Sequence, residues 1–116
     1  MNAAQVAAEW ARVFTLGKAR GKIDELFEGD TSRAHRMSRR ACGMLYDFSK
    51  TALTEESFAA LIDLAEAADV AAARDAMFAG EKINTTEGRA VLHTALRAGP
   101  EAVIEVDGVD VMPEVR

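Results

Sequence analysis

Glycine and helix-capping residues divide the stretch from Met77 to Arg97 more sharply than any other part of the chain. Gly80 follows an apolar helical pattern and suits the position just past a helix end, where a left-handed backbone is favoured. Asn84-Thr85-Thr86-Glu87 matches a capping box, in which the first side chain accepts from the amide of the fourth residue. The stretch therefore predicts a helix that ends, a turn, and a second helix over residues 86–97.

Apolar residues at three- and four-residue spacing predict further helices elsewhere in the chain. The clearest example is the first, in which Val6, Trp10, Val13 and Phe14 share one side. The ends of the predicted helices are placed by glycines, by hydroxyl side chains that can cap a helix, and by acidic residues in first turns. The predicted segments are residues 3–16 ended by Gly17, a turn at 23–27 ended by Gly29, Arg33 to about Ala41, a helix opened by Thr54-Glu55-Glu56, and Val70 to about Ala79 capped by Asp69.

Two segments have the alternating pattern of strands instead. Met44 to Ser49 alternates and contains aromatic residues, which predicts a short strand or an extended crossing segment. Residues 103–111 form two alternating runs around Asp107-Gly108, which predicts a tight hairpin. Pro113 then suits the first turn of a helix. We therefore expect a mainly α fold with a short β-hairpin near the C-terminus.

Length and composition limit the class of protein. A chain of 116 residues, of which 49% are apolar and 28% charged, is typical of one small globular domain and excludes disordered and fibrous classes. Cys42 is the only cysteine, so an intramolecular disulfide is excluded. The first residues lack the basic and apolar regions of a signal peptide, and no window has the apolar length of a membrane span. We expect a cytoplasmic protein with no membrane contact.

The net charge of −5 is unevenly distributed. Residues 1–50 contain nine Lys/Arg and six Asp/Glu, whereas residues 51–116 contain five and thirteen. Nucleic-acid binding draws most of its affinity from phosphate neutralisation, so an acidic chain is a poor candidate for it. Only a local basic patch would change that conclusion, and we expect no nucleic-acid partner.

Such a patch is predicted on the helix from Arg33 to Ala41. Arg33, Arg36, Arg39 and Arg40 fall on one face of that helix, with His35 nearby. The face could bind an anionic partner such as RNA or a membrane. We favour a solvated or internally paired face, because no aromatic residues alternate with the charges as a base-stacking surface requires.

Other titratable residues give no assembled site. His93 lies between Arg89 and Arg97 on the predicted helix 86–97 and could help to bind phosphate, although a solvated or docked face is favoured. Cys42 has no positioned base, and the two histidines match no metal-binding spacing. Gly80-Glu81-Lys82 lacks the spacing of a phosphate-binding loop. We assign no catalytic, cofactor-binding or metal-binding residue in this chain.

Three ordered segments resemble the N-terminal region of glucose-6-phosphate isomerases. They are Met77 to Arg97, similar to MFxGEKINxTExRAVLHxALR; Tyr46-Asp47-Phe48-Ser49-Lys50, similar to D-[YF]-S-K; and Val106 to Val115, similar to VDGxDVMPEV. The linker Ala98-Gly99-Pro100-Glu101-Ala102 departs from the Asn- and Arg-rich linker of the family, and residues 1–43 are only loosely similar.

The resemblance implies a cofactor-independent, dimeric, cytosolic enzyme that interconverts glucose 6-phosphate and fructose 6-phosphate. It also implies that the catalytic glutamate and the phosphate-binding loops belong to α/β domains that follow this segment. Neither Glu87 nor His93 then has a catalytic role. We expect residues 1–116 to be a single N-terminal segment that packs on those α/β domains and is inactive alone.

Pro113 opens a helical turn only three residues before the end of the sequence, and this also favours a piece of a longer protein. Isolated, such a segment would leave its apolar stripes partly exposed, which predicts marginal stability or self-association. The alternative is a free-standing helical module that uses the basic face from Arg33 to Arg40 to bind an anionic partner.

Overall fold

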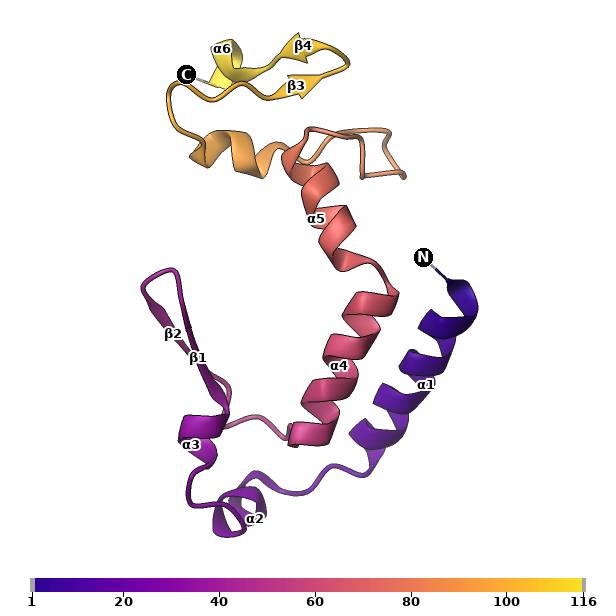
Figure 1. Cartoon of the computed structure of the whole chain (residues 1–116), viewed down its shortest axis with the longest axis vertical. Helices are drawn as coiled ribbons and strands as arrows, with labels where there is room; N and C mark the ends of the chain where they lie inside the picture. Colours follow the sequence, from indigo (N-terminus) through magenta and orange to yellow (C-terminus); the bar gives the residue numbers. More distant parts are fainter. Residues whose placement is uncertain (1, 116) are drawn as a thin grey trace. The chain divides into compact units, whose positions relative to one another are not determined.

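The structure is a computed structural model that describes residues 2–115, arranged as two compact units with a boundary between Ala68 and Asp69 (Figure 1). The first unit contains α1 (Ala3–Lys18), α2 (Ile23–Glu28), α3 (Arg33–Arg36), β1 (Ser38–Ala41), β2 (Met44–Asp47) and α4 (Glu55–Ala67). The second contains α5 (Val70–Phe78), the 3-10 helix η1 (Leu92–Arg97), β3 (Glu105–Val106), β4 (Val109–Asp110) and α6 (Met112–Val115). The expected fold class, mainly α with a short hairpin near the C-terminus, is confirmed.

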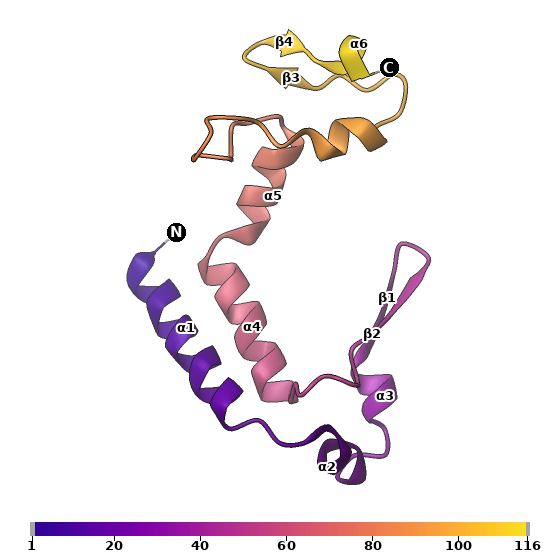
Figure 2. The ribbon, with the colours of Figure 1, turned by 180° about the vertical axis from the view of Figure 1, so that it is seen from behind.

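The helices α1 and α4 lie side by side in the first unit (Figures 1 and 2). The Asn2 side chain caps α1 by accepting from the amide of Ala4 at 3.1 Å. An ion pair of 2.6 Å between Arg12 and Asp63 joins the two helices. Gly17 does not end α1 as predicted, because one glycine weakens a helix without removing its hydrogen bonds.

A second hairpin replaces the latter half of the helix predicted from Arg33 to Ala41. The α-helical part stops at Arg36, and β1 then pairs antiparallel with β2 in the register Ser38↔Asp47. Cys42 and Gly43 form the turn with φ values of 51° and 73°, the left-handed backbone that a two-residue hairpin requires. The strand β2 was predicted and is confirmed, whereas its pairing partner was predicted to be helical and is not.

The start of α4 agrees with the prediction. Thr54 Oγ1 accepts from the amide of Ser57 at 3.1 Å, and Ser57 Oγ accepts from the amide of Thr54 at 2.7 Å. This reciprocal pair is a capping box. In the following turn, the ring of Phe58 stacks on Phe48 at a centroid distance of 5.3 Å, which attaches the end of the β2 region to α4.

The predicted end of α5 is also confirmed. Gly80 has φ +78°, its amide donates to Met77 O at 3.3 Å, and the amide of Glu81 donates to Ala76 O at 3.0 Å. These two bonds form a Schellman motif. At the other end of α5, Asp69 occupies the N-cap position as predicted, but its backbone is left-handed (φ 59°) and its side chain makes no capping hydrogen bond to the helix.

The predicted helix 86–97 is wrong over its first half. The backbone amide and carbonyl of Asn84 pair with those of Arg89 at 3.1 and 3.2 Å, so residues 84–89 form a closed turn. Asn84 Oδ1 accepts from the amide of Glu87 at 3.3 Å, as predicted, but inside this turn. Arg89 thus occupies the backbone amide and carbonyl of Asn84, which the first turn of a helix would use. Within residues 86–97, only η1 is therefore helical.

The C-terminal hairpin and the helical turn after it are confirmed. Asp107 and Gly108 connect β3 to β4 with φ values of 54° and 76°. Asp110 Oδ1 accepts from the amide of Met112 at 3.0 Å and caps α6, in which Pro113 takes part as predicted. Met112, 2% exposed, anchors this region.

Many large apolar side chains remain exposed on both units. The most exposed are Leu96 at 69%, Val103 at 67%, Val109 at 65% and Phe14 at 63%. The expectation that apolar stripes are partly exposed in this chain is therefore confirmed. None of the helices described between residues 2 and 115 is long and apolar enough to cross a membrane.

Candidate functional site

The four arginines that were predicted to form one helix face lie on two elements, α3 and β1, and have separate surroundings. Arg33 is buried, with 3% of its surface exposed. Its guanidinium donates from Nε to Ser49 O at 2.9 Å and from Nη2 to Thr51 O and Leu53 O at 2.8 and 2.7 Å. Arg33 is therefore an internal anchor for the segment between β2 and α4.

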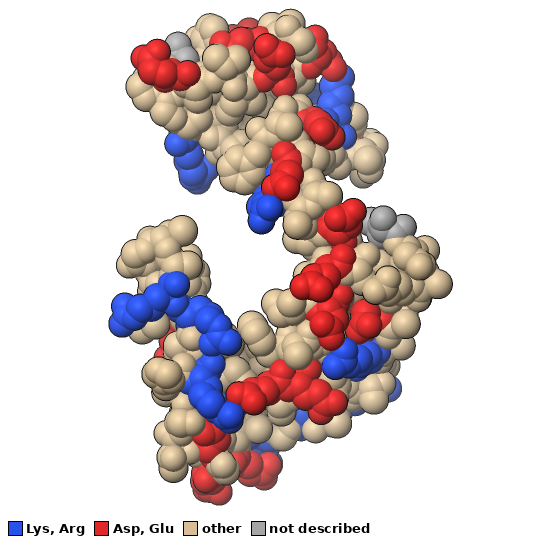
Figure 3. Space-filling view, in the orientation of Figure 1, with Lys and Arg blue, Asp and Glu red and all other residues tan. Residues whose placement is uncertain are grey.

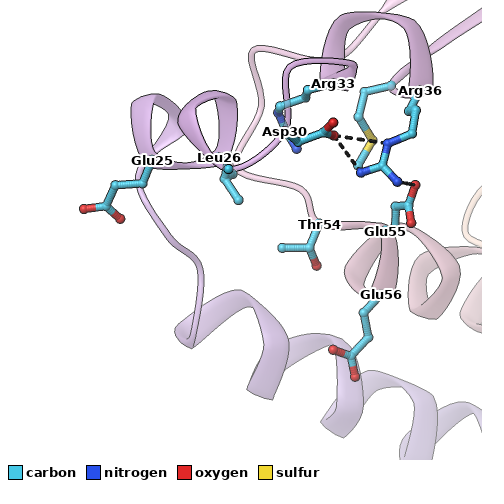
Figure 4. Close-up of a pocket in the computed structure, with 10 residues that line it drawn as sticks. Glu25, Leu26, Asp30, Arg33, Arg36, Thr54, Glu55 and Glu56 are labelled. Atoms are coloured by element: carbon cyan, nitrogen blue, oxygen red, sulfur yellow. Dashed lines mark hydrogen bonds and ion pairs between the residues drawn. The ribbon is translucent and has the colours of Figure 1, made fainter.

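Arg36 is neutralised by two carboxylates in a pocket of about 440 Å³ (Figure 4). Its Nη2 lies 2.6 Å from Asp30 Oδ2, and its Nη1 lies 2.8 Å from Glu55 Oε1. Hydrogen bonds from Arg36 and then from Ser32 lower the pKa of Asp30 below its ordinary value. The pocket also contains Glu25 and Glu56, so its balance of charge is negative.

Arg39 is fixed in place by its own backbone and by aromatic rings. Its Nη1 donates to Arg36 O and Ser38 O, each at 2.8 Å. Its guanidinium carbon lies 5.6 Å from the ring centroid of Phe58 and 5.9 Å from that of Phe48, within the range of cation–π attraction. Arg40, by contrast, is exposed on β1 opposite Leu45.

The prediction of one continuous basic face is therefore wrong. Two of its four arginines make their contacts within the first unit. Arg33 is a buried anchor, and Arg36 forms ion pairs with carboxylates. The favoured interpretation, that the arginines are internally paired, holds for both. Arg33 stands four residues before the apolar Met37, and the structure buries both side chains.

The histidines and the cysteine are not brought together with carboxylates. His93 is exposed in η1, where its carbonyl accepts from Arg97 Nη1 at 3.0 Å. Arg89 closes the turn with Asn84, so the helix face on which Arg89, His93 and Arg97 could have bound phosphate, the less favoured interpretation, does not form. Glu87 accepts from Asn84 Nδ2 at 3.3 Å within that turn.

Cys42 lies exposed in the turn between β1 and β2, and His35 is exposed on α3. Across residues 2–115, no three His, Cys, Asp or Glu side chains lie close enough together to hold a metal ion. The described residues thus form a mainly helical segment with two hairpins. Its charged residues mainly stabilise local structure.

Comparison with known proteins shows to which family this segment belongs. The family model of phosphoglucose isomerase matches residues 47–116, more than half of the chain, and the chain belongs to that family. A glucose-6-phosphate isomerase of Shewanella amazonensis is 51% identical over 92% of this chain and 20% of its own length. One of Deinococcus radiodurans is 57% identical over 80% of this chain and 17% of its own. The chain thus spans about a fifth of the length of these relatives.

A further relative supports the same assignment. The protein named glucose-6-phosphate isomerase 1 of Streptomyces avermitilis is 58% identical over 80% of this chain and 17% of its own length. The resemblance drawn from the three sequence motifs is therefore confirmed. The match of the family model includes only the last residue of β2, all of α4 and the second unit, but not α1 or β1.

Proposed function

We propose that this chain is the N-terminal part of a glucose-6-phosphate isomerase, the enzyme that interconverts glucose 6-phosphate and fructose 6-phosphate. The observation that carries the proposal is the similarity to isomerases that are more than 50% identical over at least 80% of the chain. Sugar phosphate is the substrate only of the full-length enzyme. We also propose that this enzyme is a cytoplasmic homodimer that needs no cofactor.

The 116-residue chain is proposed to have no isomerase activity alone. Proton transfer between neighbouring carbons needs a base held within hydrogen-bond reach of the substrate. Glu87 is the acid that the motif makes most conspicuous, and its carboxylate is bonded to Asn84 inside a turn. His93 and His35 are exposed and lie outside any described cluster of acids. These features support a scaffold role, with catalysis by residues outside this segment.

The exposed apolar side chains support the proposal that residues 1–116 pack as one segment on the α/β domains of the enzyme. Leu96, Val103 and Val109 are each more than 60% exposed. Exposed large apolar side chains that lie together usually mark a contact surface. In the full-length enzyme these side chains would lie against the following domains.

The activity proposal is tested by replacing the matching segment of the Deinococcus radiodurans isomerase with residues 1–116 of this chain. Isomerase activity is measured by coupling glucose 6-phosphate formation to NADP reduction. We expect turnover by the chimera and none by the 116-residue chain. Turnover by the short chain alone would place the chemistry within residues 1–116 and refute the proposal, as would a folded chimera without activity.

A further inference from the structure

A second pocket in the first unit differs in charge from the one around Arg36. It has a volume of about 330 Å³ and is lined by Ala34, His35, Ser38, Arg39, Arg40 and Leu45. Among the described residues, no carboxylate lines it. Figure 3 shows Lys and Arg side chains gathered over α3 and the β1–β2 hairpin, in a chain whose net charge is −5. The pocket is therefore a locally positive site on an acidic protein.

The two arginines of this pocket keep hydrogen-bond donors free. Both hydrogen bonds of the Arg39 side chain come from Nη1, so its Nε and Nη2 donors are unused within the described residues. Two carbonyls and two rings hold this guanidinium, which lowers the entropy lost when it binds a ligand. Arg40 forms no ion pair or side-chain hydrogen bond with any residue between 2 and 115 and is free to close on a ligand.

The other lining residues suit a small phosphate-bearing molecule. The His35 imidazole supplies at least one N–H donor in either protonation state. Leu45 and Ala34 supply an apolar wall against which an organic group can pack. Guanidinium groups match the oxygens of a phosphate with two parallel hydrogen bonds, which favours phosphate over a simple halide.

We infer that His35, Arg39 and Arg40 form a binding site for the phosphate group of a small phosphate monoester, separate from isomerase catalysis. All six lining residues lie before residue 47, outside the part of the chain that the family model matches. Because the site is measured by binding, its failure would leave the proposed isomerase function untouched.

The test is a nuclear magnetic resonance titration of the 116-residue chain at constant ionic strength. The probes are inorganic phosphate, glucose 6-phosphate and neutral glucose, with chloride as the balancing anion. We expect saturable shifts at His35, Ser38 and Arg40 with both phosphates and none with glucose. Equal affinity for the two phosphates would assign recognition to the phosphate group alone. Tighter binding of glucose 6-phosphate would show that the sugar also contacts the pocket.

Two substitutions distinguish a specific binding site from nonspecific electrostatic attraction of the phosphate to the chain. Arg40→Ala should weaken phosphate binding about three- to tenfold, the range for loss of one exposed charge-assisted contact. Arg89→Ala removes the same charge from an exposed position in the other unit and should leave the affinity unchanged. Equal weakening by both variants, or shifts that chloride alone reproduces, would overturn the inference. His35→Gln provides a second variant and should weaken binding while both arginines remain.

Discussion

Arg33 Nη2 donates to the carbonyl oxygen of Leu53 at 2.7 Å and thereby joins α3 to the last residues before α4. The same guanidinium holds Ser49 O and Thr51 O. This cation is buried against three carbonyl oxygens, with the Phe27 ring 5.7 Å from the guanidinium carbon. The segment that leads from β2 into α4 thus takes its shape from one side chain contributed by α3.

Arg33→Met should destabilise the first unit by about 2–4 kcal/mol, because it leaves buried carbonyl oxygens without donors. Arg40→Met is the matched control, since Arg40 is exposed and should change stability by less than about 0.5 kcal/mol. Urea unfolding followed by circular dichroism measures both. Equal stability of the two variants would show that Arg33 is not an anchor.

Gly80→Ala should destabilise the second unit by at least about 2 kcal/mol. The left-handed backbone alone costs an L-residue roughly 1–2 kcal/mol, and a Cβ at this position would also collide with the carbonyl oxygen of Glu105. Gly88 has φ +64° but open space around it, so Gly88→Ala should show only the backbone cost. Thermal melting of both variants separates the two contributions. A smaller loss of stability for Gly80→Ala than for Gly88→Ala would contradict the close approach of Gly80 to the carbonyl oxygen of Glu105.

Thr54→Ala should destabilise α4 by about 1 kcal/mol, because it removes the hydroxyl that caps the amide of Ser57. Thr31→Ala, at an exposed position before α3, is the control and should be nearly neutral. Hydrogen exchange of the first amides of α4 would report the loss directly. Unchanged protection of those amides in Thr54→Ala would argue against the cap.

Acid should weaken the first unit through Asp30. Its pKa lies below 3.8 in the folded chain, because Arg36 and Ser32 donate to its carboxylate. A folded pKa below the unfolded one means that the stabilisation is full above about pH 3.8 and is lost as the pH falls through the folded pKa. Asp30→Asn should therefore show a smaller loss of stability between about pH 5 and pH 3 than the unchanged chain. Identical pH profiles would exclude this contribution.

The isolated chain should self-associate through its exposed apolar side chains. Leu96 and Val103 are 69% and 67% exposed, and replacing both with serine should reduce association. Sedimentation velocity over a range of concentrations measures this, with Thr85→Ser as a control at an exposed polar position. A chain that remains monomeric and melts cooperatively would count against the proposed contact surface.

Local signals in the sequence predicted elements whose hydrogen bonds are made within a few residues. The Gly80 helix end, the Thr54 cap and the Asp107-Gly108 hairpin each depend on such short-range bonds, and all three are confirmed. The wrong predictions concern segments whose structure depends on hydrogen bonds to a partner segment further along the chain. Residues 38–41 have a helix-compatible pattern, but pairing with Met44 to Asp47 makes them a strand.

The candidate site was predicted less well than the fold for the same reason. Sequence spacing placed four arginines on one face, but spacing carries no information about the carbonyl oxygens that surround Arg33. The turn from Asn84 to Arg89 is a related case. Its side-chain bonds were foreseen, yet backbone pairing across the turn excluded the helix that such bonds usually start.

The pairing of α1 with α4 has a consequence for how this chain is synthesised. Arg12 and Asp63 form their ion pair across 51 positions, so α1 leaves the ribosome well before its partner helix exists. During that interval Val6, Val13 and Leu16, which are half-buried in the folded unit, have no partner helix beside them. Nascent α1 therefore keeps the apolar side that faces α4 exposed to water until translation reaches α4.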